Sequence, residues 1–137
     1  MVDRSDSNDP KDWLAVADED YGFARTNLKD PQTSYFAQIC FHYQQATEKY
    51  LKAFIVAEKL EFKKTHELPT LLQICQKVEP SFDKFKDECN FLTEFYYEPR
   101  YPVILPVSNI TRKDAEKAQS YAKTIGDFVK EKLKIKK

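Results

Sequence analysis

The sequence predicts an all-α protein, an up-and-down helical bundle of about five helices with short connections. Apolar residues recur at three- and four-residue spacings along most of the chain, and no segment alternates long enough to predict a strand. The length of 137 residues fits one domain. We expect a disordered N-terminal segment over residues 1–8 and a single helical domain over residues 9–137.

The first two helices have clear signals. Asp9 can cap a helix and Pro10 suits its first turn, so the first helix is expected to begin there and to end at the segment KDPQTS. The second helix is expected over about residues 35–59. It is apolar almost all round, which places it at the centre of the bundle.

The remaining helices follow in order. The third is expected after the segment THEL and ends at EPS, and the fourth carries apolar residues from Phe82 to Tyr96. The last begins at a capping box, with Thr111 as the cap and Asp114 three residues later. Its basic end, KEKLKIKK, suits the negative end of the helix dipole and is expected to be solvated.

Composition excludes several classes of function. The 22 basic and 22 acidic residues balance, so we expect no extended nucleic-acid face, and no apolar run is long enough for a membrane span. The only glycines, Gly22 and Gly126, form no phosphate-binding loop. The cysteines show no metal-like or disulfide spacing, which favours buried thiols in the cytoplasm. We expect no metal and no cofactor.

Polar residues form a line along the otherwise apolar second helix. They recur at steps of four, three, four and three residues, which places them on one side of a helix: Gln38, His42, Gln45, Lys49 and Lys52. Glu48 lies beside the line and can pair with Lys52. Two interpretations stay open at this point. The line is either the face of the helix that meets water, or the floor of a groove that binds a ligand.

The segment TEFYYEPRYPVILP places Arg100 between aromatic residues and prolines. Arg100 can hold two phosphate oxygens at once, or it can tie the segment to nearby carbonyl and carboxylate groups. Tyr101 offers a ring on which the guanidinium can stack. If the helices alternate strictly in direction, one end of the bundle gathers a set of polar residues and favours anions: Lys52, Lys59, His66, Arg100 and Thr111.

Three motifs in this order, CFHYQQATEKYLKAFI, KTHEL and EPRYPV, resemble the HEPN domain family (higher eukaryotes and prokaryotes nucleotide-binding domain) over about residues 13–133. The resemblance implies a small helical bundle, commonly dimeric and often encoded beside a minimal nucleotidyltransferase. Some members are proposed to bind nucleotides, and others are RNA-cleaving or toxin-like. The ribonuclease branch has a histidine shortly after an arginine that Arg100 matches, but residues 101–109 contain no histidine.

We therefore expect a homodimeric module, not catalytic by itself, that binds a nucleotide or other phosphate-bearing ligand, or a minimal nucleotidyltransferase protein. One alternative is a HEPN-type ribonuclease or toxin in which a relocated histidine, His66, acts with Arg100. Another is a purely structural helical adaptor. The expected ligand-binding residues are Arg100, Lys49, Lys52, Gln45, His66, His42, Glu48 and Tyr101.

Overall fold

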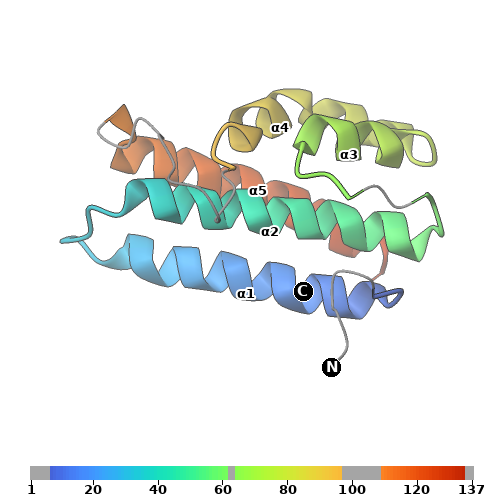
Figure 1. Cartoon of the computed structure of the whole chain (residues 1–137), viewed down its shortest axis with the longest axis horizontal. Coiled ribbons are helices and arrows are strands. Elements are labelled where there is room, and N and C mark those ends of the chain that lie inside the picture. Colours follow the sequence, from blue (N-terminus) through green and yellow to red (C-terminus); the bar gives the residue numbers. More distant parts are fainter. Residues whose placement is uncertain (1–6, 62–63, 97–108, 135–137) are drawn as a thin grey trace.

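A computed structural model of the chain describes residues 7–61, 64–96 and 109–134. These residues form helices and no strand, which confirms the predicted all-α class (Figure 1). The elements in chain order are α1 (Pro10–Lys29), α2 (Phe36–Ala57), α3 (Leu68–Gln76), the 3-10 helix η2 (Pro80–Phe85), α4 (Lys86–Thr93) and α5 (Arg112–Lys132).

The predicted helix starts of α1 and α5 are confirmed in atomic detail. Asp9 Oδ1 accepts a hydrogen bond from the backbone N–H of Lys11 at 2.9 Å. At α5, Thr111 and Asp114 form the reciprocal capping box. Of the segment expected to be disordered, residues 1–6 lie outside the described residues. Ser7 is described, and its carbonyl accepts a hydrogen bond from Trp13 Nε1 at 3.0 Å.

The predicted fourth helix is divided into two parts. It begins as the 3-10 helix η2 and continues from Lys86 as α4. A 3-10 helix has about three residues per turn, so Phe82 and Phe85 project from the same side. Both rings are buried, at 0% and 3% exposure, and this shared burial favours the tighter helix.

The core forms around α2, which packs against α1, α3, α4 and α5. Its central side chains are fully buried, among them Tyr43, Leu51 and Ile55. The cysteines are buried as well. Burial raises the pKa of the Cys40 thiol to about 12, so this thiol stays protonated and unreactive at neutral pH.

The helices do not alternate strictly in direction, which corrects one prediction. Figure 1 shows α5 running in the same direction as α2. The guanidinium of Arg112, at the start of α5, donates to the carbonyls of Leu28 and Asp30 at 2.8 and 3.0 Å. The start of α5 therefore lies beside the end of α1, at the opposite end of the bundle from the end of α2.

The prediction that Thr111 joins Lys52 and Lys59 at one end of the molecule is thus wrong. The physical reason is the placement of α3. His66, shortly before α3, lies 2.9 Å from Glu48 in the middle of α2, and the end of α3 lines a hollow together with Leu60, just beyond α2, so α3 runs in the same direction as α2 (Figure 1). Because α3 does not reverse direction after α2, the later alternation of α4 and α5 places the start of α5 at the other end of the bundle (Figure 1). Within the described ranges, no helix has both the length and the apolarity needed to cross a membrane.

A left-handed residue ends α2. Lys59 has a φ of 54°, and the next residue, Leu60, donates its N–H to the carbonyl of Ile55 at 3.0 Å. This is a Schellman motif, in which glycine is the usual residue at the position of Lys59 because it has no Cβ. We predict that Lys59→Gly raises the free energy of unfolding by about 0.5–1 kcal/mol in urea denaturation.

The matched control is Lys59→Ala, which removes the same charge and side chain but keeps the Cβ. It should leave the unfolding free energy near that of the wild type. Equal stabilisation by both variants would show that the lysine side chain, and not the left-handed backbone conformation, destabilises the wild type at this position.

Candidate functional site

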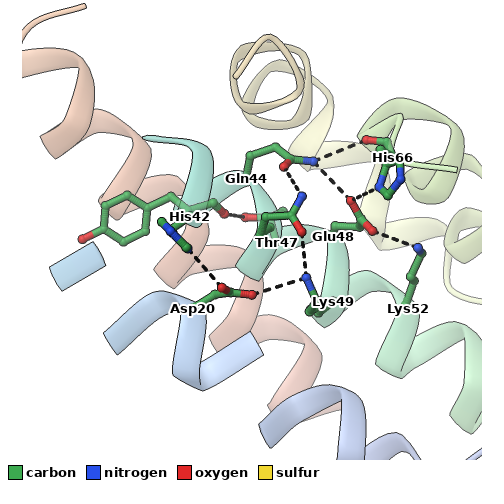
Figure 2. Close-up of polar contacts among 10 residues, drawn as sticks. Asp20, His42, Gln44, Thr47, Glu48, Lys49, Lys52 and His66 are labelled. Atoms are coloured by element: carbon green, nitrogen blue, oxygen red, sulfur yellow. Dashed lines mark hydrogen bonds and ion pairs between the residues drawn. The ribbon is translucent and has the colours of Figure 1, made fainter. Parts of the chain in front are cut away.

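A buried carboxylate, Glu48, lies beside the polar line of α2 and contacts Lys52 of that line (Figure 2). Its Oε2 accepts from Lys52 Nζ at 2.9 Å, which agrees with the predicted pair, and its Oε1 lies 2.9 Å from His66 Nδ1. The side chains of Glu48 and Lys52 are only 4% and 7% exposed. This part of the line is therefore packed inside the protein and is not the face of α2 that meets water.

A second carboxylate, Asp20, reaches the line from α1. Its two oxygens lie 3.2 Å from His42 Nδ1 and 3.3 Å from Lys49 Nζ. Asp20 is not among the ligand-binding residues predicted from the sequence. The available signal was its position seven residues after Trp13, on the same face of the helix as that apolar residue. A carboxylate on the face of α1 that packs against α2 is placed to meet the lysine of a neighbouring helix.

Gln44 links the two carboxylates into one network. Its Nε2 lies 3.3 Å from Glu48 Oε1 and 3.4 Å from the carbonyl of His66, and it donates to both. Its Oε1 accepts from Gln45 Nε2 at 2.8 Å, and Gln45 Oε1 accepts from Lys49 Nζ at 2.9 Å. Figure 2 shows this continuous path, called here the Glu48 network. Gln44 is fully buried, so it holds its neighbours in fixed positions.

Aromatic rings border the network. His66 stacks on Tyr96 with ring centroids 4.2 Å apart and planes inclined by 12°. Tyr96 in turn lies 6.4 Å from Phe41, and His42 lies 4.5 Å from Phe23. The side chain of His66 is 47% exposed, so one polar ring of this border is accessible to a ligand or partner.

A hollow of about 240 Å³, called here the Glu48 hollow, opens beside the network between α1, α2 and His66. Lys52 Nζ lies 5.7 Å from the centre of the Trp13 ring, so the hollow combines an aromatic wall with ammonium groups. Such a lining suits a ligand that has both a ring and an anionic group. Two carboxylates also line it, and its walls are formed by Asp12, Trp13, Val16, Gln45, Glu48, Lys49, Lys52 and His66.

Five of the predicted ligand-binding residues therefore meet at one hollow: Gln45, Glu48, Lys49, Lys52 and His66. His42 does not line this hollow and joins the same network through Asp20. The predictions for Arg100 and Tyr101 fall outside the described residues. Among the residues that the structure describes, no group of three metal-binding side chains is arranged to hold a metal ion.

A family model covers most of the chain. Residues 10–132 match the HEPN domain, so the chain belongs to the HEPN domain family. It is 27% identical, over 90% of each chain, to a Methanocaldococcus jannaschii protein named "Putative toxin MJ1304".

Two solved structures are similar to this chain in fold. The protein TT1696 from Thermus thermophilus has a TM-score of 0.77 and 27% identity, covering 92% of this chain and 99% of its own. ST0689, named an archaeal HEPN homologue, has a TM-score of 0.72 and 23% identity, covering 91% of this chain and 98% of its own, and it supports the fold alone.

Proposed function

We propose that this protein is a nucleotide-binding module, not catalytic by itself, that holds its ligand in the Glu48 hollow. The observation that supports the proposal is the meeting of Trp13, Lys49 and His66 around one hollow. The aromatic wall suits a base, and ammonium groups suit phosphates. We further propose that the module works as a homodimer with a minimal nucleotidyltransferase protein as its partner.

The two lysines have different roles in this proposal. Lys52 is 7% exposed and bonded to Glu48, so it fixes the carboxylate and shapes the hollow. Lys49 is 18% exposed and lies 3.3 Å from Asp20, a longer contact that an incoming phosphate can replace. Arg100 lies outside the described residues. As a guanidinium it can bind two phosphate oxygens at once, and we propose that it completes the site.

Calorimetry with ATP and GTP tests this proposal. We expect Lys49→Gln and Arg100→Gln each to weaken binding by about tenfold or more, because each removes a charge-assisted contact to phosphate. The matched control is Lys113→Gln, which removes the same charge from an exposed position of α5. The absence of heat with either nucleotide at millimolar concentration would refute nucleotide binding, and light scattering of the same samples reports whether the protein is dimeric.

A second candidate is a ribonuclease or toxin, and the position of His66 favours it. The ring of His66 is exposed and stacks on Tyr96, which precedes Arg100 by four residues in the sequence. The name of the Methanocaldococcus jannaschii relative points to the same class. Here His66 transfers a proton during attack by the 2′-hydroxyl, and Arg100 binds the phosphate. RNA cleavage by the wild type, lost in His66→Ala and Arg100→Ala, distinguishes this function from simple nucleotide binding.

A further inference from the structure

A second hollow, of about 340 Å³, lies between α1 and α5 and is called here the α1–α5 hollow. Its wall on α1 includes Gly22, which follows Trp13 of the Glu48 hollow by nine residues and therefore lies about 180° around the helix from it. The two hollows thus lie on different sides of α1. None of the residues around the α1–α5 hollow lines the Glu48 hollow.

Gly22 has no packing reason to be glycine. A Cβ added at this position meets nothing within 4 Å. Glycine inside a helix costs about 1 kcal/mol relative to alanine. Gly22 therefore lowers the stability of α1, and no steric clash requires it. Its effect is to leave the wall of the hollow open, with the backbone of α1 accessible. The other glycine, Gly126, also lines this hollow, but there a Cβ would lie only 2.7 Å from the Tyr50 ring.

The charges around the hollow leave one cation in excess. Lys130 Nζ lies 2.7 Å from Asp18 Oδ1, and Lys123 Nζ lies 2.8 Å from Asp127 Oδ2, so these four charges compensate in pairs. Arg25 makes no ion pair with any described residue. Its guanidinium carbon lies 5.9 Å from the centre of the Tyr21 ring.

The Asp18 carboxylate also accepts a hydrogen bond from a hydroxyl group. The Tyr50 hydroxyl donates to the same oxygen of Asp18 that Lys130 contacts, at 2.5 Å. Burial, followed by this hydrogen bond, raises the pKa of the Tyr50 hydroxyl, which therefore stays neutral. With Asp18 held by two donors, Arg25 is the charge left to attract a ligand.

We propose that the α1–α5 hollow binds a small metabolite with an oxyanion group, either a phosphate or a carboxylate. Arg25 makes the main ionic contact, because a guanidinium offers two parallel donors to two oxygens. The open wall at Gly22 admits the ligand against the helix backbone. This site is separate from the nucleotide site proposed above and does not depend on it.

The two glycines provide a direct readout. They are the only glycines of the chain and both line the hollow, so their amide signals in a ¹H–¹⁵N correlation spectrum report on this site. We expect inorganic phosphate or succinate, each titrated alone to millimolar concentration, to shift both signals in a saturable manner. If neither anion shifts them, the proposal is wrong.

Variants separate this site from general electrostatics. Arg25→Gln and Gly22→Leu should each weaken anion binding by about tenfold or more, the first by loss of the guanidinium and the second by filling the hollow. In Gly22→Leu the Gly126 signal still serves as the readout. Lys29→Gln, which removes one charge from an exposed position of α1, should bind as the wild type does. Equal weakening by Lys29→Gln, or normal binding by Gly22→Leu, would overturn the proposal.

Discussion

Replacing Glu48 by alanine is expected to lower the free energy of unfolding by about 3–5 kcal/mol, measured by urea denaturation. The change leaves the ammonium of Lys52, 7% exposed, without its carboxylate at 2.9 Å. It also removes an acceptor for Gln44 and the contact of His66. Losing a carboxylate at this distance is costly for a buried ammonium, because less attraction then offsets its desolvation.

A double variant separates the stability role of this pair from its role in binding. In Glu48→Leu/Lys52→Met both charges disappear and apolar side chains of similar size fill the space, so stability should return to near that of the wild type. The nucleotide affinity of this double variant should nevertheless be lower than that of the wild type, because the Glu48 hollow has lost both charged side chains. A cost below about 1 kcal/mol for Glu48→Ala would show that water reaches Lys52 and that the pair is not effectively buried.

The sequence was sufficient to predict the long helices, since their ends depend on local chemistry. Asp9 and Thr111 bind backbone N–H groups within three residues, and such caps act whatever surrounds them. The position of α5 in the bundle does not depend on local chemistry. It depends on tertiary contacts such as those of Arg112 with Leu28 and Asp30, which lie 84 and 82 residues away in the sequence.

The candidate site was predictable to the extent that it lies on one helix. Lys49, Lys52 and Glu48 follow from helical spacing, and so does the Glu48–Lys52 pair. Asp20 and Gln44 were missed for different reasons. Asp20 comes from another helix, so its partners depend on how α1 packs on α2. Gln44 is completely buried. Glutamine is usually exposed, so its polarity alone predicts a surface position.

These missed residues change the interpretation of the site. Considered alone, α2 offers a carboxylate to Lys52, through Glu48, and none to Lys49. With Asp20 of α1 in place, each lysine has a carboxylate within 3.3 Å. A ligand phosphate must therefore compete with a carboxylate, and the accessible pair of Lys49 with Asp20 is where this exchange is easiest. For this reason Lys49, and not Lys52, is the residue whose replacement best tests nucleotide binding.

Gly126→Ala is expected to destabilise the protein by about 2 kcal/mol, although alanine favours helices. The new Cβ would lie 2.7 Å from Cε2 and 2.9 Å from Cζ of Tyr50. The ring cannot easily move away, since it is 4% exposed and its hydroxyl is held by Asp18 at 2.5 Å. Thermal or urea denaturation measures this cost.

The other glycine supplies a control with the opposite expected sign. Gly22→Ala adds the same methyl group inside a helix where nothing lies within 4 Å, so it should stabilise the protein by about 0.5–1 kcal/mol. The cost of Gly126→Ala should also fall in a Tyr50→Leu background, because the atoms that clash are then gone. Stabilisation by both alanine variants would mean that α5 can move away from α2 at this contact, and the close approach of the two helices would then not be what requires Gly126.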